Sequence, residues 1–367
     1  MSALGTDDRA HAAAPAPTAA GAPRPVGTGR LVSVGPLAVR LHLRPALAAA
    51  GLTAALAAVA TLALMTGDFP LTAGEVWRAL RGSGDGGSAF IVTTLRLPRL
   101  LTGLLVGAAL GLSGALLQGL ARNVLASPDI IGFTSGAATG AILAFVLGAG
   151  SLVLIGAGAV AGGLLAAVAV YTLAHRHGNT GTRLVLVGIG VTAGLTSVNS
   201  FLISRAPLHD AVAAQAWLVG GLNNRGWEHA RPVGAALIVL APLAVAVARR
   251  LTVLEFGDDP AAALGVPAER TRRLLLAVAV SLAAVATASA GPVAFVALAA
   301  PQLARRLAGP ARPSPLTAAL TGALLLAASD VLTQRLFAPT PLPVGILTAG
   351  LGGLYLTWIL AAGWRRP

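Results

Sequence analysis

Long apolar runs, each bounded by arginine, recur along this sequence and restrict its fold more than any other feature. An arginine at the centre of a bilayer costs about 2.5 to 3.5 kcal/mol, so membrane-spanning helices exclude it from their interiors. Runs without an interior arginine cover residues 45–66, 100–120, 128–148, 151–174, 184–204, 232–248, 274–290, 292–304, 316–334 and 343–363. The sequence therefore predicts an all-α polytopic membrane protein with about ten transmembrane helices.

The composition agrees with a membrane protein and excludes several other classes. The chain is 56% hydrophobic and only 11% charged, whereas a soluble domain carries about 25% charged residues. Its net charge of +13 comes entirely from arginine, because the sequence has no lysine. These arginines flank apolar runs, so we expect contact with membrane lipid and no nucleic-acid partner.

Several kinds of chemistry are missing from the sequence. A nucleotide-binding P-loop needs a lysine, which this chain lacks, so the chain cannot be its own P-loop ATPase. Without cysteine it can form neither disulfides nor thiolate metal sites. The histidines do not form a ligand set, and we expect no catalytic residues, no metal site and no cofactor. The predicted protein is a transport subunit rather than an enzyme.

The arrangement of arginines predicts the topology. Residues 1–44 are rich in Ala, Pro, Gly and Arg, which predicts a disordered tail, and residues 45–367 form the membrane domain. An even number of spans places both termini on one side, together with Arg249, Arg250, Arg305 and Arg306. Because cytoplasmic loops are enriched in arginine, we expect a multi-pass protein of the cytoplasmic membrane with both termini cytoplasmic.

Small residues spaced by four recur inside the apolar runs, and this spacing lets helix backbones approach closely. They are Gly103, Gly107 and Gly111; Gly132, Gly136 and Gly140; and Gly190 and Gly194. We expect their helices to form the packed centre of the bundle, a role in packing rather than a direct function.

One carboxylate, Asp330, lies well inside an apolar run. A carboxylate in the membrane marks a functional site by default. The alternative is a residue near the helix end that pairs with Arg335 or a backbone group.

A long and specific resemblance to a known family begins at residues 94–137, TLRLPRLLTGLLVGAALGLSGALLQGLARNVLASPDIIGFTSGA. It continues through LEFGDDPAAALGVPAERTR, SAGPVAFVALAAPQLARRLAG and SDVLTQRLFAPTPLPVGILTAGLGGLYLTWIL, and covers residues 45–363. These segments resemble the FecCD-type permeases of ATP-binding cassette (ABC) importers for ferric siderophores, haem and cobalamin. APQLARR and GGLYL look more like ferric enterobactin permease subunits.

The resemblance implies a type II ABC importer permease that translocates a ferric siderophore. It implies three partners: cytoplasmic ATP-binding subunits, an extracytoplasmic substrate-binding protein, and a second permease subunit in a homodimer or heterodimer. A permease of the same family for cobalamin or haem remains an alternative. A secondary transporter or channel acting alone, or a membrane enzyme, would belong to a different class.

The resemblance also assigns roles to residues. The inner-face loop 255–273 would contact the ATPase through Gly257, Asp258, Asp259, Ala262, Leu264 and Gly265. Basic residues on the outer face would dock the binding protein, namely Arg96, Arg99 and Arg335. An inner gate would be formed by Asn123, Val124 and Leu125 opposite Thr180, Gly181 and Thr182. Ser197, Asn199 and Ser200 would either line the pathway or form hydrogen bonds between helices.

The chain departs from the family pattern at several positions, of which one lies in the predicted gate turn. Many relatives have Pro where this chain has Val124, which puts the rigidity of the gate turn in question. Many also have His where Gln302 stands.

Overall fold

The computed structural model describes residues 30–34, 37–41, 43–129, 132–148, 151–175, 180–309, 314–336 and 342–363. The chain divides into two compact units, Met1–Leu43 and Arg44–Pro367. In the first unit, strands β1 (Arg30–Val34) and β2 (Leu37–Leu41) pair antiparallel, with Val32 opposite Val39. These strands differ from the disorder predicted for residues 1–44, because β-branched residues on both segments favour pairing. Residues 1–29 lie outside the described part.

The second unit is helical, and each of the ten predicted spans contains one helix. These helices are α1 (Leu43–Met65), α4 (Leu97–Ala121), α5 (Phe133–Val146), α6 (Leu152–His175), α7 (Thr180–Arg205), α9 (Trp227–Leu254), α11 (Ala268–Ala290), α12 (Val296–Ala308), α13 (Pro315–Leu336) and α14 (Val344–Gly363). Seven segments of the described chain are long and apolar enough to cross a membrane, and two shorter apolar helices are α5 and Val344–Trp358 of α14. The remaining helix, α12, is the shortest of the ten.

Short elements connect these helices at the surface. They are α2 (Ala73–Leu80), α3 (Gly86–Phe90), the π-helical turn Ile91–Arg96, α8 (Leu208–Leu218) and α10 (Asp258–Ala263). A capping box begins α2: the Glu75 backbone N–H donates to Thr72 Oγ1 at 3.3 Å, and the Thr72 N–H donates to the Glu75 carboxylate at 2.7 Å. The Thr72 hydrogen bonds hold the pKa of Glu75 below its ordinary value.

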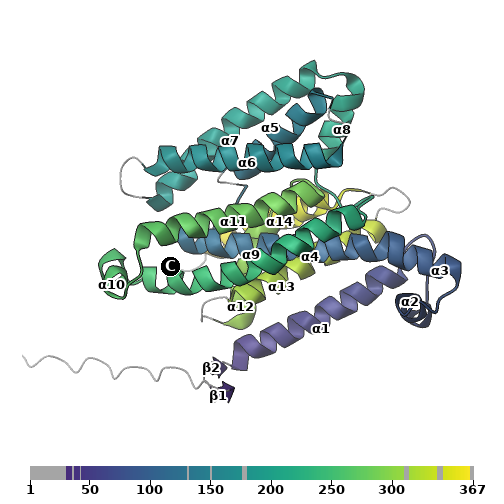
Figure 1. The fold of residues 1–367 in the computed structure, drawn as a ribbon, viewed down its shortest axis with the longest axis horizontal. Helices are drawn as coiled ribbons and strands as arrows, with labels where there is room; N and C mark the ends of the chain where they lie inside the picture. Colours follow the sequence, from purple (N-terminus) through teal and green to yellow (C-terminus); the bar gives the residue numbers. More distant parts are fainter. Residues whose placement is uncertain are drawn as a thin grey trace, which may run out of the picture. The chain divides into compact units, whose positions relative to one another are not determined.

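The helices form two groups that meet along α6 and α11 (Figure 1). In one group α5 packs against α6, α7 and α8, and in the other α4 packs against α9, α11, α12 and α13. The two groups touch mainly through α6 and α11. Most of α4 and α11 is buried, whereas little of α1 and α7 is buried.

Glycines permit the closest helix contacts. A Cβ on Gly111 would lie 2.2 Å from the Ala318 carbonyl oxygen of α13, and one on Gly140 would lie 1.9 Å from the Gly158 carbonyl of α6. The spacing thus predicts the packing of α4 and α5 correctly. The same prediction is wrong for Gly190 and Gly194 of α7, because nothing lies within 4 Å of an added Cβ there. This glycine face of α7 is open in the single chain.

Three backbone segments meet where α11 ends. The break lies at Gly291 (φ 74°), as the apolar pattern predicts, and α12 begins five residues later. The Gly221 N–H donates to the Ala290 carbonyl at 2.8 Å, and the Gly345 N–H donates to the Gly220 carbonyl at 3.2 Å. A Cβ on Gly220 would lie 2.1 Å from the Pro292 oxygen. The loop after α8, the break and the start of α14 therefore touch through their backbones.

Candidate functional site

The loop between α9 and α11 contains α10, where the resemblance implies contact with an ATPase. Gly257 (φ 112°) and Gly265 (φ 75°) bracket this helix in conformations that favour glycine. Arg272 of α11 donates to Asp258 at 2.7 Å, and Ala261 is fully buried. One side of α10 is thereby attached to the bundle, next to the inner ends of α9 and α11.

The other side of α10 is exposed. Asp259, Ala262 and Leu264 all point away from the core. Leu264 is 68% exposed, and Phe256, just before α10, is 74% exposed. Large apolar side chains exposed together beside acidic residues are typical of a surface that meets a protein partner.

The predicted gate turn follows α4, which ends at Arg122 in a left-handed conformation (φ 49°). Asn123 closes the turn with its side chain, because its Oδ1 accepts the Leu125 N–H at 2.9 Å. Gln302 of α12 donates its amide Nε2 to the Val124 carbonyl at 2.9 Å. The turn therefore has a tether from α12 in place of the rigid ring that a proline would provide.

Thr180, Gly181 and Thr182 form the first turn of α7. Their side chains lie outside the described part of the structure, so their predicted place opposite the gate turn stays a prediction.

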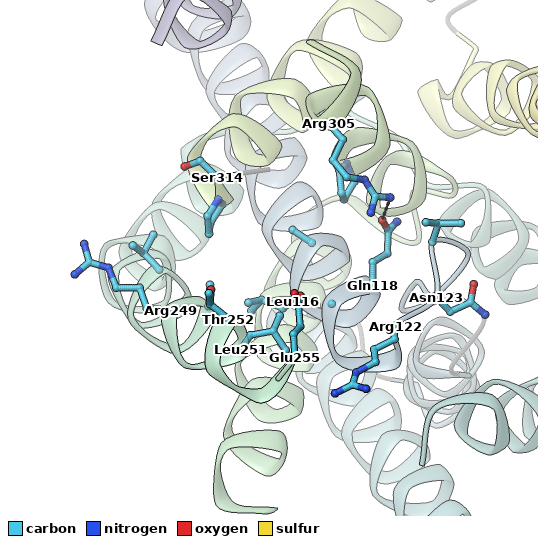
Figure 2. Close-up of a pocket in the computed structure, with 17 residues that line it drawn as sticks. Leu116, Gln118, Arg122, Asn123, Arg249, Leu251, Thr252, Glu255, Arg305 and Ser314 are labelled. Atoms are coloured by element: carbon cyan, nitrogen blue, oxygen red, sulfur yellow. Dashed lines mark hydrogen bonds between the residues drawn. The ribbon is translucent and has the colours of Figure 1, made fainter. Parts of the chain in front are cut away.

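A cavity of about 750 Å³ lies between the ends of α4, α9 and α12 on the side predicted to be cytoplasmic, and is called the inner cavity (Figure 2). Its polar lining comprises Gln118, Arg122, Asn123, Arg249, Thr252, Glu255, Arg305 and Ser314. Arg305 donates to Gln118 Oε1 at 3.2 Å, and Gln118 donates to the Leu298 carbonyl at 3.0 Å. Sequence reasoning placed Asn123 and Val124 at the inner gate, and the structure places both on the wall of this cavity.

A polar cavity of about 770 Å³ lies between α5, α7, α8, α14 and the break after α11. Asn199 and Ser200 line it, whereas Ser197 is not in its lining and bonds the Ala193 carbonyl of its own helix. Asn199 also accepts a hydrogen bond from Thr139 of α5 at 2.6 Å. Asn199 therefore lies on the wall of this cavity and also forms a hydrogen bond between helices, and its place in a pathway stays a prediction.

Sequence reasoning missed other residues of this polar cavity. Asp129 lines it and accepts a hydrogen bond from Thr134 at 2.6 Å. Gln215 of α8 and Thr192 of α7 add further polar groups. Asp129 lies at the start of the apolar run 128–148, in the segment that carries the resemblance. A carboxylate at that position could have indicated a functional residue from the sequence.

The outer-face arginines have different environments. Arg96 donates to the Leu64 carbonyl at 2.7 Å and to the Phe69 carbonyl, so it binds the loop after α1. Arg99 donates through Nε and Nη2 to both carboxylate oxygens of Asp330, at 3.0 and 2.8 Å. Arg335, at the end of α13, is exposed.

The suggested pairing of Asp330 with Arg335 is wrong. Five residues separate them, which puts them on different faces of one helix, whereas residues four apart are neighbours. Gln334, four residues on, donates to Asp330 at 2.8 Å, and Arg99 of α4 provides the charge partner. Arg99 also donates to Asn223 at 2.9 Å. This network joins α4, α13 and the loop before α9, so it stabilises the outer end of the bundle.

Among the described residues, no three His, Asp or Glu side chains gather as metal ligands. The features that stand out are two cavities, a gate turn and an exposed helix on one face, which suit a conduit.

Comparison with known proteins places the chain in a family. The model of the FecCD transport family matches residues 55–362. The chain is 45% identical over 303 residues to the ferric enterobactin transport system permease protein FepG of Escherichia coli (strain K12), covering 83% of this chain and 92% of the relative. It is 40% identical over 309 residues to the achromobactin transport system permease protein CbrC of Dickeya dadantii (strain 3937), covering 83% and 88%.

A solved structure supports the same assignment. The fold resembles an inward-facing conformation of an ABC transporter assigned to the metal-chelate type, with a TM-score of 0.77 and 28% identity. The match covers 86% of this chain and 98% of that one. The helical architecture and the family match over most of the length agree, and the chain belongs to the FecCD transport family.

Proposed function

We propose that this chain is the membrane-spanning permease subunit of an ABC importer that moves a ferric siderophore across the cytoplasmic membrane. The observation that carries the proposal is the 45% identity to a ferric enterobactin permease over most of both chains. The polar cavity, the gate turn and the exposed α10 give the proposal a physical route.

A partner ATPase supplies the energy in this proposal. The sequence has no lysine and so no P-loop, and α10 offers a contact through which a soluble subunit can act. Its exposed Leu264 and the preceding Phe256 provide apolar anchors. Its other side is held to α11 by the ion pair between Arg272 and Asp258. A push on α10 is therefore passed to α11, the helix that joins the two helix groups.

The polar cavity is the proposed pathway. Its hydroxyl and amide groups make weak contacts, and passage of a bulky chelate needs weak contacts because strong ligands would trap it. The gate turn at Asn123 and Val124 closes the inner end in this scheme. Gln302 sets the position of that turn through the Val124 carbonyl.

The remaining partners are assigned to open surfaces. The glycine face of α7, at Gly190 and Gly194, is suited to close approach by a second permease subunit, identical or paralogous. On the outer face, Arg335 is the most accessible of the three predicted docking arginines, and Arg96 and Arg99 act mainly by ordering the surface around it. An exposed arginine steers and orients an acidic partner more than it holds it. The arginine-rich face that carries α10 is assigned to the cytoplasm, which places both termini there.

The test is uptake of an iron-labelled chelate into proteoliposomes that contain this chain with its ATPase, binding protein and partner permease. We expect ATP-dependent uptake of a ferric siderophore and none when the ATPase is left out. Cobalamin and haem in the same panel test the alternatives within the family. Accumulation by this chain without any ATPase would overturn the proposal in favour of a secondary transporter.

A matched pair of variants tests the ATPase contact. Phe256→Asp removes an apolar anchor beside α10, and Phe69→Asp makes the same change at a residue that is 70% exposed on the outer side. An anchor residue contributes about 2 kcal/mol to an interface, so Phe256→Asp should weaken ATPase binding about thirtyfold. If both variants copurify with equal amounts of ATPase, α10 and Phe256 do not contribute to the ATPase interface.

A further inference from the structure

A second, apolar groove adjoins the inner cavity. The groove has a volume of about 510 Å³ and lies between α4, α9 and α13. It shares the lining residues Val245 and Arg249 with the inner cavity, so the two spaces are neighbours at this end of α9. The inner cavity therefore offers polar and cationic side chains, and the neighbouring groove offers an apolar wall.

The groove results from small and interrupted side chains. Ala241, Ala246 and Ala319 line it and leave room between α9 and α13, and Pro242 interrupts the hydrogen bonds of α9 beside them. From Ala241 to Arg249 the groove follows α9 for about 12 Å at 1.5 Å per residue. Half of the hydrocarbon core of a bilayer is about 15 Å thick. The groove thus covers most of one leaflet, the leaflet on the arginine-rich side.

Arg249 lies where the groove meets the inner cavity. It is exposed, and in the part of the chain that the structure describes no hydrogen bond or ion pair is recorded for it. In Figure 2 its guanidinium points away from Arg122 and Arg305, toward the rim of the cavity. Those two arginines are engaged, Arg122 with the Leu254 carbonyl at 2.7 Å and Arg305 with Gln118. Of the three arginines in the described lining of this cavity, Arg249 is therefore the one available to an outside ligand; Glu255 also lines the cavity.

We propose that the groove and the adjoining rim of the inner cavity bind one acidic phospholipid of the cytoplasmic leaflet. The phosphate lies at Arg249, and one acyl chain fills the groove between α9 and α13. Basic pockets between transmembrane helices on the cytoplasmic side have the chemistry to bind acidic headgroups. The apolar groove favours a lipid over free phosphate, because a free anion would gain nothing from the apolar wall that follows α9 for about 12 Å.

The experiment measures lipid retention by the full-length chain. The protein is purified in detergent, loaded with phosphatidylglycerol or phosphatidylcholine, and analysed by native mass spectrometry. Arg249→Gln is compared with Arg250→Gln, which makes the same charge change at an adjacent exposed residue outside both cavities. One arginine at a membrane surface contributes enough for about a fivefold change in affinity. We expect Arg249→Gln to bind phosphatidylglycerol about fivefold more weakly and Arg250→Gln to bind it unchanged. Binding of phosphatidylcholine should be the same for both variants.

A second variant tests the groove without changing charge. Ala319→Phe fills the space for the acyl chain, and we expect about a tenfold loss of both lipids' retention. Inorganic phosphate and glycerol phosphate serve as competitors. If they displace phosphatidylglycerol at equal concentration, or if Arg249→Gln and Arg250→Gln have equal effects, the site is a free-anion site or a general surface charge and the proposal fails.

Discussion

Replacing Gly111 of α4 by alanine tests the helix packing that supports both cavities. The added Cβ would lie 2.2 Å from the Ala318 carbonyl oxygen, whereas ordinary contact begins at 3.4 Å. A backbone oxygen cannot rotate away as a side chain can, so α4 and α13 must separate by about an ångström. Gly51→Ala on α1 is the matched control, because nothing lies within 4 Å of its added Cβ.

The magnitude follows from two opposing terms. Alanine in place of glycine favours a helix by about 1 kcal/mol, and this gain applies to both variants. Overpacking costs about 1 to 3 kcal/mol, and a clash between two backbones belongs at the upper end. We therefore expect Gly111→Ala to be destabilising by about 2 kcal/mol and Gly51→Ala to be stabilising by about 1 kcal/mol. The difference of about 3 kcal/mol corresponds to more than a hundredfold in the unfolding equilibrium.

The assay is unfolding of the purified chain in mixed micelles by titration with sodium dodecyl sulfate, followed by tryptophan fluorescence. The midpoint should fall for Gly111→Ala and rise slightly for Gly51→Ala. Equal midpoints would show that α4 and α13 do not approach as closely as described, and the argument from glycine spacing would be refuted for this helix pair.

Three further predictions concern polar contacts. Asp330→Asn leaves Arg99 without its charge partner in a mostly buried site, so the free energy of unfolding should fall by about 3 kcal/mol in the same micelle titration; an unchanged midpoint would mean that the pair is not formed. Tyr171→Phe removes the hydroxyl that donates to Glu269 between α6 and α11. In the proposed importer, we expect ATP hydrolysis to persist while the chelate taken up per ATP falls. An unchanged ratio of uptake to ATP hydrolysis would show that this contact does not link the ATPase to transport. Gln302→Leu frees the Val124 carbonyl, so dye leakage from proteoliposomes should rise, whereas Gln302→His should restrict it.

Much of the fold could be predicted from the sequence because the bilayer imposes one simple rule. Arginine is costly in the hydrocarbon core, so each arginine-free run corresponds to one of the ten helices, and the arginines lie near the helix ends. The break at Gly291 was also predictable, since glycine and proline interrupt an apolar run there. The strands at residues 30–41 were not, because their short apolar segments are surrounded by residues typical of disorder.

The candidate site was less predictable, because it depends on contacts between distant segments. Glycines are spaced by four in both α4 and α7, yet within the chain only those of α4 face a neighbouring helix closely. The spacing alone does not show what lies opposite a helix face. Asp330 could be recognised as unusual from its apolar surroundings. Its partner Arg99 is more than two hundred residues away in sequence, so only the fold could identify it.

The contact between the loop after α8, the break after α11 and the start of α14 has a mechanical consequence. Amide and carbonyl groups inside a membrane need partners, and water is scarce there to replace a lost one. Separating Gly221 from Ala290, or Gly345 from Gly220, would leave a backbone N–H and a carbonyl without a hydrogen-bond partner. In any rocking motion of the bundle, these three segments should therefore move together as one rigid unit. Bending should then occur elsewhere along the chain.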